Sequence, residues 1–254
     1  MKALVTGAGN GIGRAIAHRL AADGAEVVAV DLDGEAAAAT AKSVGGRAVC
    51  CDISDEAAVA SMAESVGALD ILVNNAGIWR SHTLAESTLA EMEQVLRTNV
   101  LGSWLVTRAL VPKFGRAGGA IVNLASVVAI TGAEGRGAYS ASKAGIIALT
   151  RQMASEYAPL GIRVNAVGPG LIVTEGTSAE FGHPGVQQAI GDALPLGRLG
   201  RPDDIAAVVS FFAAPAAGYV TGQTLFVDGG WTVNGSAFIA TAVQGFLAQL
   251  AANS

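Results

Sequence analysis

The sequence has little charge and few side chains that bind metals. Of its 254 residues, 15% are Asp, Glu, Lys or Arg, below the ~25% usual in soluble domains, and the formal net charge is −5. This acidic balance disfavours a nucleic-acid or anionic-membrane surface, so neither partner is predicted. The only cysteines, Cys50 and Cys51, are adjacent and the three histidines are scattered, which excludes zinc-site spacings and disfavours a structural disulfide. We therefore expect a protein without a metal site that works in a reducing compartment, the cytoplasm.

Long uninterrupted hydrophobic runs are also lacking. Residues 1–6 have neither the extended apolar region nor the small-residue cleavage site of a signal peptide. The uncharged stretch 205–227 is long enough to span a bilayer, but Pro215, Gly218 and Gly222 divide it. This stretch is interpreted as a helix over 205–214, a turn, and a strand over 223–227.

Apolar segments typical of strands alternate with helical patterns along the whole chain. Strands are predicted over 3–5, 26–31, 48–51, 71–73, 120–124, 162–167 and 223–227. Helices are predicted from the spacing of Ile12, Ile16 and Leu20 and over 35–43, 55–66, 91–111, 139–157 and 205–214. Strands that are apolar throughout and separated by helices predict an α/β fold with a parallel sheet covered on both faces. A TIM barrel has the same alternation, but the first turn argues against it.

The first turn, over residues 6–13, is rich in glycine and joins a strand to a helix. Gly7, Gly9, Gly11 and Gly13 allow the backbone to approach a pyrophosphate, and the helix N-terminus offers free N–H groups to it. The literal G-x-G-x-x-G pattern is absent, because Ile12 stands where its last glycine would be. Glycine-rich turns also occur without ligands, so the turn needs support from the next strand.

Asp31 closes the second predicted strand and gives that support. A carboxylate there can accept hydrogen bonds from both adenosine-ribose hydroxyls and repels a 2′-phosphate. Its neighbours Asn10 and Leu32 carry no charge to neutralise such a phosphate, so NAD is favoured over NADP. The alternative is a solvated acid at the end of a strand.

A tyrosine and a lysine four residues apart form the candidate catalytic pair. Tyr139 and Lys143 share one face of a predicted helix. A nearby ammonium and a positively charged nicotinamide favour the phenolate, so the tyrosine can exchange a proton with an alcohol or carbonyl oxygen near neutral pH. Ser126 follows the strand that precedes this helix and is predicted to face the crevice of the sheet. Alone, a Tyr-x-x-x-Lys pair is usually a surface feature.

Taken together, these motifs resemble the short-chain dehydrogenase/reductase family over nearly the whole chain. The matching elements are Thr6-Gly7-x-x-x-Gly11-x-Gly13, Asp52-Ile53, Asn74-Asn75-Ala76-Gly77, the tetrad Asn99, Ser126, Tyr139 and Lys143, Pro169-Gly170, and the run from Gly222 to Gly230. The resemblance implies a three-layer, doubly wound Rossmann fold with a seven-stranded parallel sheet, in one catalytic domain over 1–235.

The resemblance also implies a role for each matching residue. Tyr139 is the acid/base, Lys143 binds the nicotinamide ribose and lowers the tyrosine pKa, Ser126 orients the substrate oxygen, and Asn99 holds a water in a proton relay. The implied cofactor-binding set is Gly7, Asn10, Gly11, Ile12, Gly13, Asp31, Leu32, Asp52, Ile53, Asn75, Ala76, Gly77, Tyr139, Lys143, Pro169, Gly170, Ile172 and Thr174. A purely structural role, tying neighbouring strands together, is the alternative for the Asn-Asn-Ala-Gly turn.

Residues that set the substrate are predicted around the segment 171–201, where the family keeps a mobile loop. Trp79 and the residues Val128, Ile130 and Glu134 are candidates to line the pocket. A mostly apolar pocket with a few polar points suits a small secondary alcohol, cyclic or aromatic, or the matching carbonyl compound.

The last residues, 236–254, carry no charge and are predicted to form a helical extension. Ile239, Val243, Phe246, Leu247 and Leu250 form its apolar stripe. Because an apolar stripe is normally buried, we expect it to pack on a neighbouring subunit, over the mouth of that subunit's active site. Packing on its own domain is the alternative. The resemblance implies a homotetramer built on the helices near 91–111 and 139–157, with apolar residues Leu101, Trp104, Leu105, Ile146, Ile147 and Leu149.

Two other interpretations remain open. The run from Pro195 to Pro202 also looks like that of 3-oxoacyl-acyl-carrier-protein reductases, which generally use NADPH; Asp31 and the acidic balance argue against this alternative. A non-catalytic NAD-binding regulator on the same fold is the second, and the complete tetrad argues against it.

Overall fold

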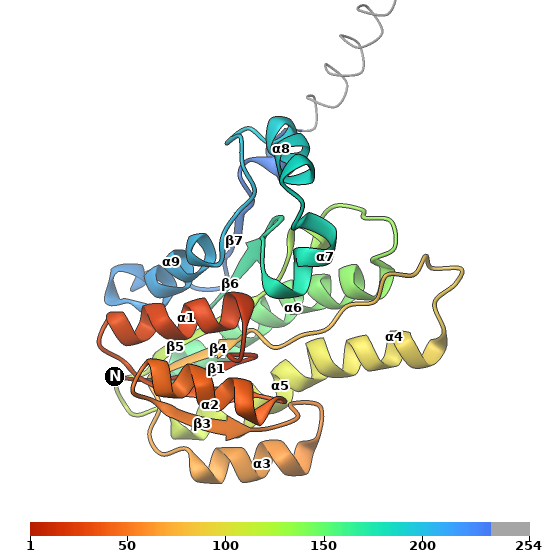
Figure 1. The fold of residues 1–254 in the computed structure, drawn as a ribbon. Helices are drawn as coiled ribbons and strands as arrows, with labels where there is room; N and C mark the ends of the chain where they lie inside the picture. The colour runs from red at the N-terminus through yellow and green to blue at the C-terminus, as the bar shows by residue number, and fades with distance from the viewer. Residues whose placement is uncertain (235–254) are drawn as a thin grey trace, which may run out of the picture.

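The fold is built on one parallel sheet with helices packed around it (Figure 1). The computed structural model describes residues 1–234. The strands are β1 (Lys2–Thr6), β2 (Glu26–Asp31), β3 (Arg47–Cys50), β4 (Ile71–Asn74), β5 (Gly119–Leu124), β6 (Ile162–Pro169) and β7 (Thr224–Val227). Their order in the sheet is β3-β2-β1-β4-β5-β6-β7, and every pair is parallel. The chain reverses its direction of travel across the sheet between β1 and β4, which creates a crevice at the carboxyl ends of these two strands.

Helices cover both faces of the sheet. They are α1 (Gly11–Ala22), α2 (Gly34–Ser43), α3 (Glu56–Ser65), α4 (Leu89–Leu96), α5 (Ser103–Leu110), α6 (Gly137–Tyr157), α7 (Ser178–Phe181), α8 (Pro184–Ala193) and α9 (Pro202–Ala213). Successive residues of β1 face opposite sides: Ala3 and Val5 pack with α1 and α9, whereas Leu4 packs with α3 and α5. The predicted three-layer, doubly wound fold with seven parallel strands is therefore confirmed, and the open sheet excludes the barrel.

Two predicted elements differ from the observed ones. The helix predicted over 91–111 consists of α4, a π-helical segment Arg97–Gly102, and α5. The loop predicted over 171–201 contains two helices, α7 and α8, together with the short 3-10 turn Glu175–Thr177. Side chains that cap helix starts explain this second difference, because Thr174 and His183 each accept a hydrogen bond from a backbone N–H within the following turn.

Of the six apolar residues predicted for a subunit interface, Leu149 is half-buried and packs against the core, and the other five divide into two groups. Leu101 and Trp104 are exposed, as an interface on this protein requires. Leu105, Ile146 and Ile147 are buried in the protein's own core, so including them was wrong. The reason is that α5 and α6 lie directly on the sheet and turn these side chains towards it.

The predicted extension 236–254, with its apolar stripe, lies outside the described residues. The division of the chain into a domain over 1–235 and an extension therefore stays a prediction. Within residues 1–234, no helix is long and apolar enough to cross a bilayer.

Buried amide side chains connect β4, which ends at the crevice, with its neighbour β5. Asn74 and Asn123 are paired in register across β4 and β5, and Asn74 Nδ2 donates to Asn123 Oδ1 at 2.9 Å. Asn74 Nδ2 also donates to Thr107 Oγ1 on α5, and Asn123 Nδ2 donates to Thr150 Oγ1 on α6. This chain of hydrogen bonds fixes the strand ends to the helices that cover them.

Replacing Asn123 with Leu removes two of these hydrogen bonds in a buried, apolar environment. We expect Asn123→Leu to lower the free energy of unfolding by about 1–3 kcal/mol in urea denaturation. The exposed amide of Gln152 on α6 provides the control, because Gln152→Leu is expected to change it by less than about 0.5 kcal/mol. Equal stability of the two variants would contradict the proposed role of the amide chain.

Candidate active site

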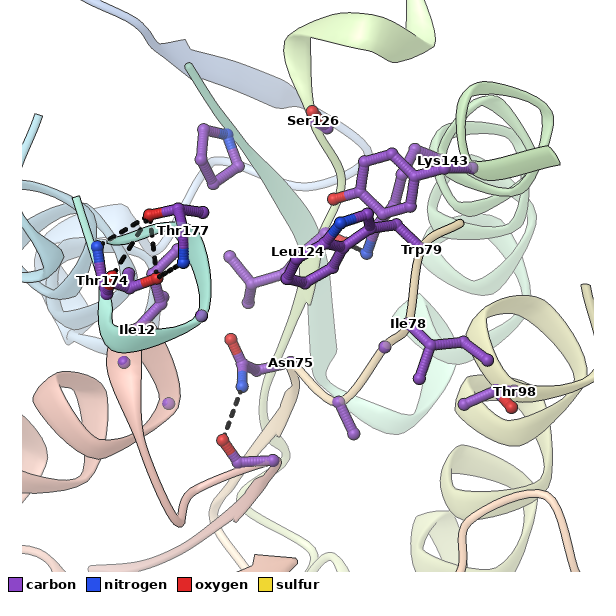
Figure 2. Close-up of a pocket in the computed structure, with 18 of the residues that line it drawn as sticks. Ile12, Asn75, Ile78, Trp79, Thr98, Leu124, Ser126, Lys143, Thr174 and Thr177 are labelled. Carbon is purple, nitrogen blue, oxygen red and sulfur yellow. Dashed lines mark hydrogen bonds between the residues drawn. The ribbon is translucent and has the colours of Figure 1, made fainter. Parts of the chain in front are cut away.

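A cleft of about 840 Å³ opens at the carboxyl ends of the central strands. This volume is within the range of ligand pockets, roughly 300–1,000 Å³. Figure 2 shows Ser126, Lys143 and Trp79 on one side of the cleft, Ile12 and Thr174 on the other, and Asn75 between them. All the residues predicted to bind cofactor or to act in catalysis line it, with the single exception of Asn99.

The glycine turn after β1 is packed too closely for side chains. A Cβ atom on Gly13 would lie 1.9 Å from the carbonyl oxygen of Gly7, and Gly7 itself has a φ of +63°. Asn10, the residue before α1, makes no side-chain hydrogen bond to the first turn of this helix. Asn10 thus leaves the start of α1 uncapped, and a carboxylate, that of Glu175, lies at the Gly11 N–H. A helix start that holds an anion in this way fits the pyrophosphate of a dinucleotide.

The Asn-Ala-Gly turn after β4 is attached to the glycine turn by hydrogen bonds. Thr6 Oγ1 accepts from the backbone N–H groups of Asn75 and Ala76, at 3.0 and 3.1 Å. Asn75 Nδ2 donates to the carbonyl oxygens of Thr6 and Gly7, at 2.9 and 3.0 Å. The structural role considered for this turn is therefore observed, and the same residues line the cleft.

Asp31 lies at the end of β2 with its carboxylate held towards the glycine turn. Oδ2 accepts from Gly9 N at 2.8 Å, and Oδ1 accepts from Asp33 N at 3.1 Å. The adjacent side chain of Leu32 is 70% exposed. Asp52, at the next strand end, is held by Ser54, whose N–H and hydroxyl both donate to Asp52 Oδ1.

Tyr139 and Ser126 come together in the cleft from α6 and from the end of β5. Burial raises the pKa of Tyr139 above its usual value, whereas a hydrogen bond with Ser126 and the positive charge of Arg136 act in the opposite direction. The lowering that the family resemblance assigns to Lys143 stays a prediction.

Lys143 is buried one helical turn after Tyr139. Its Nζ donates to the carbonyl oxygen of Leu124 at 2.7 Å and lies 5.5 Å from the centre of the Tyr139 ring. Burial lowers the pKa of this ammonium to about 8. None of the salt bridges among residues 1–234 includes Lys143. A buried cation of this kind has remaining donors for hydroxyl groups of a ligand.

Asn99 lies behind the cleft, in the π-helical segment, and is 1% exposed. Its Oδ1 accepts from Ile78 N at 2.8 Å, and its Nδ2 donates to Ile78 O and to Ser142 Oγ, both at 2.9 Å. The side chain thus fixes the segment after Gly77 to α6. Its predicted role in holding a relay water stays a prediction.

The segment after β6 forms the wall opposite Tyr139. Pro169, Gly170, Ile172 and Thr174 all line the cleft, and Thr174 faces Gly11 closely enough that a Cβ there would touch its side chain at 3.4 Å. Val128, Glu134 and Trp79 also line the cleft as predicted, but Ile130 does not and is 58% exposed. Ile130 follows the short 3-10 turn after Ser126, which ends there and leaves its side chain in solvent.

Of the charged residues that line the cleft, sequence reasoning missed Arg80, Arg97, Arg136 and Glu180. Arg136 pairs with Glu180 at 2.6 Å, and Arg14 and Glu175, outside the cleft lining, form a second pair. Arg80, also at the cleft, donates to Gln94 Oε1 at 2.8 Å. The partners are far apart in sequence, and no local pattern indicates them. Among residues 1–234, no group of three or more potential metal ligands comes together.

Comparison with known proteins shows which sequences this chain is similar to. Residues 7–232 match the family described as enoyl-(acyl carrier protein) reductase. The chain is 40% identical over 245 residues to the D-threitol dehydrogenase of Mycolicibacterium smegmatis, covering 91% of this chain and 92% of that one. It is also 39% identical over 238 residues to the 3-oxoacyl-[acyl-carrier-protein] reductase of Aquifex aeolicus, covering 89% and 95% of the two chains.

A solved structure supports the same grouping. The structure of a short chain dehydrogenase/reductase family protein has a TM-score of 0.82 to this chain and 37% sequence identity, and the match covers 90% of this chain and 96% of that one. Fold, cleft and sequence agree over almost the whole length, so the chain belongs to the short-chain dehydrogenase/reductase family.

Proposed function

We propose that this protein interconverts a small secondary alcohol and its carbonyl compound with NAD(H) as cofactor. Membership of the family makes the chain an oxidoreductase for alcohol or carbonyl groups. Ser126, Tyr139 and Lys143 line one cleft together with the glycine turn, and this observation carries the proposal of NAD(H)-dependent alcohol chemistry. Acid/base and nucleotide-binding groups therefore share one site.

The cofactor is assigned to the cleft between the glycine turn and Lys143. The N-terminus of α1 would hold the pyrophosphate, Asp31 the adenosine ribose, Ile53 the adenine, and Lys143 the nicotinamide ribose. When bound, the cofactor supplies or accepts a hydride. The wall with Ile172 and Thr174 lies opposite Lys143 and would contact the nicotinamide end.

Tyr139 and Ser126 would act on the substrate oxygen. In alcohol oxidation Tyr139 accepts the hydroxyl proton, and in carbonyl reduction it donates a proton to the oxygen. The Ser126 hydroxyl donates a hydrogen bond to the oxygen as negative charge develops there. Lys143 provides positive charge near the phenol, which favours the phenolate that oxidation needs.

Asp31 supports NAD rather than NADP. Its carboxylate is fixed by two backbone N–H groups, so it cannot turn away from a bound ribose without breaking them. A 2′-phosphate at this place meets negative charge. Neither Asn10 nor Leu32, its neighbours in the cleft, offers a compensating cation.

The substrate end of the cleft supports two classes of alcohol. Trp79, Val128, Phe181 and Trp231 line it, and such surfaces suit a cyclic or aromatic alcohol. The charged side chains Arg80, Glu134, Arg136 and Glu180 line it as well and favour a polyhydroxy alcohol as the second candidate. One of the similar proteins is named for threitol, a polyol. A panel of both classes with NAD, followed by NADH absorbance, separates them.

Two other functions have less support from the sequence. Asp31 and the net charge of −5 disfavour an NADPH-dependent reductase of acyl-carrier-protein substrates, and the complete tetrad disfavours a non-catalytic NAD-binding regulator.

A homotetramer in the cytoplasm completes the proposal. The exposed Leu101 and Trp104 support subunit association, and the free thiols of Cys50 and Cys51 support a reducing compartment.

Replacing Tyr139 with Phe keeps the ring and removes the proton-transferring oxygen. Because acid/base catalysis contributes about 10²–10⁴-fold, we expect Tyr139→Phe to lower kcat by at least about 100-fold, with little change in NADH affinity. Steady-state kinetics on the best substrate and a cofactor titration measure the two quantities. Near-normal turnover by this variant would exclude Tyr139 as the acid/base.

Replacing Asp31 with Ala removes both the ribose acceptor and the negative charge. We expect Asp31→Ala to weaken NADH binding by roughly 10–100-fold and to strengthen NADPH binding, as read by fluorescence titration. Asp203→Ala, on α9 outside the cleft, is the control and is expected to alter neither affinity. If the unmodified protein binds NADPH more tightly than NADH, the cofactor assignment is wrong.

Replacing Lys143 with Met removes a buried charge at nearly the same size. The pKa of Lys143 in the folded protein, about 8, is below the usual lysine value of 10.5. Between pH 8 and 10.5 the unfolded chain therefore binds more protons than the folded protein. The destabilisation caused by the buried charge is lost as the pH rises through this range. We expect Lys143→Met to be inactive yet more stable than the unmodified protein by about 1–3 kcal/mol at pH 7, with the difference shrinking towards pH 10. Denaturant unfolding at both pH values tests this, and a pH-independent difference contradicts it.

A further inference from the structure

One arginine joins three walls of the cleft. Arg136 is the residue before α6, three positions before Tyr139. Its Nη1 donates to Ser81 Oγ and its Nη2 to Glu180 Oε1, both at 2.6 Å. Its guanidinium also lies 6.0 Å from the centre of the Trp79 ring. The segment after β4, the start of α6 and the helix α7 therefore meet at this side chain.

Two ion pairs join the segment 171–181 to other elements. Near the glycine turn, Glu175 pairs with Arg14 of α1, and near the substrate end, Glu180 of α7 pairs with Arg136. The first pair lies beside the place assigned to the cofactor. Only the second pair is next to the proposed acid/base, so only this pair can connect the position of the segment with proton transfer.

We propose that Arg136 is a positioning residue that holds α7 over bound substrate through Glu180 and at the same time supplies positive charge to Tyr139. The proposal rests on the function proposed above, since it concerns the same proton transfer. Arg136 is assigned no contact with the reacting atoms. It acts through Glu180 on the cleft wall and through its charge on the phenol.

The charge of Arg136 acts on Tyr139 together with that of its neighbours. The charged side chains lining this part of the cleft are Arg80, Glu134, Arg136, Lys143 and Glu180. Arg136, three residues before Tyr139, lowers the phenol pKa, and Lys143, 5.5 Å from the centre of the ring, is the other cation beside it. Glu180 is bonded directly to Arg136, so it partly neutralises this charge.

The two members of the pair therefore have opposite electrostatic effects and the same mechanical effect. Removing the charge of Arg136 leaves Glu180 as an uncompensated anion, which disfavours the phenolate. Removing the charge of Glu180 leaves Arg136 as an uncompensated cation, which favours the phenolate. Either change breaks the link between α7 and α6. If the ion pair were purely structural, both changes would break the link between α7 and α6, but neither would alter the phenol pKa.

The test compares Arg136→Gln and Glu180→Gln in the full chain, using the alcohol best oxidised with NAD. Both variants are expected to raise the alcohol KM by about 3–10-fold, in keeping with a partly exposed ion pair. The pH profile of kcat/KM for oxidation is expected to move by about half a unit to higher pH in Arg136→Gln and to lower pH in Glu180→Gln. Arg136→Lys is expected to restore the profile while restoring KM only partly, since lysine lacks the second branch that reaches Ser81.

Hydrogen exchange supplies a measurement that does not depend on turnover. Amides within 171–181 are expected to exchange faster in both glutamine variants, because the segment loses its link at α7. Arg19→Gln is the matched control: it removes an arginine and its pair with Asp23 outside the cleft, and should change neither exchange nor kinetics.

Each outcome decides for or against the proposal. Opposite pH displacements together with raised KM and faster exchange support it. Profiles that coincide with that of the unmodified protein, or that move in one direction, overturn it while leaving the function proposed above intact. If the unmodified protein oxidises no alcohol and reduces no carbonyl compound, the proposed function is wrong. Unchanged hydrogen exchange in 171–181 of both glutamine variants would show that the Arg136–Glu180 pair does not hold this segment, and would overturn the present proposal.

Discussion

The arrangement of the cleft depends on the buried ammonium group of Lys143. It lies inside the protein with a backbone carbonyl, that of Leu124, as its hydrogen-bond partner. Burying a cation without an ionic partner destabilises a fold. Here the cation connects the end of β5, which presents Ser126, with the helix that presents Tyr139. In the proposed mechanism, the charge that this position keeps beside the phenol accounts for its cost.

The surrounding scaffold uses polar contacts where strand ends must be held in place. Asn74 and Asn123 connect β4 and β5 to their covering helices, and Asn75 attaches the next turn to the glycine turn. Asn99 extends this system to the segment that leads to Trp79. Apolar burial holds the layers together, whereas these amides determine where each strand ends relative to the cleft. Four chain segments distant in sequence thereby present their functional groups to one space.

Local spacing explains why much of the fold and site can be predicted from sequence. The apolar strands, the glycine turn, Asp31 and the Tyr139–Lys143 interval are all short-range patterns with direct physical meaning. The remaining features depend on tertiary contacts. The π-helical segment that turns Asn99 inward has no signal of its own, and the Arg136–Glu180 pair joins residues from separate elements. Ile146 and Ile147 were expected at an interface because an apolar helix face does not reveal whether its own sheet or another subunit covers it.

The central claim is that Tyr139, beside Lys143, becomes the proton acceptor once the cofactor is bound. Burial alone raises its pKa, so the cofactor's positive charge must lower it for catalysis near neutral pH. The most direct measurement is the pH titration of tyrosinate absorbance, taken as the difference between the unmodified protein and the Tyr139→Phe variant, with and without NAD. A Tyr139 pKa that falls when NAD binds is the predicted result. A Tyr139 pKa that NAD leaves unchanged or raises would contradict the account.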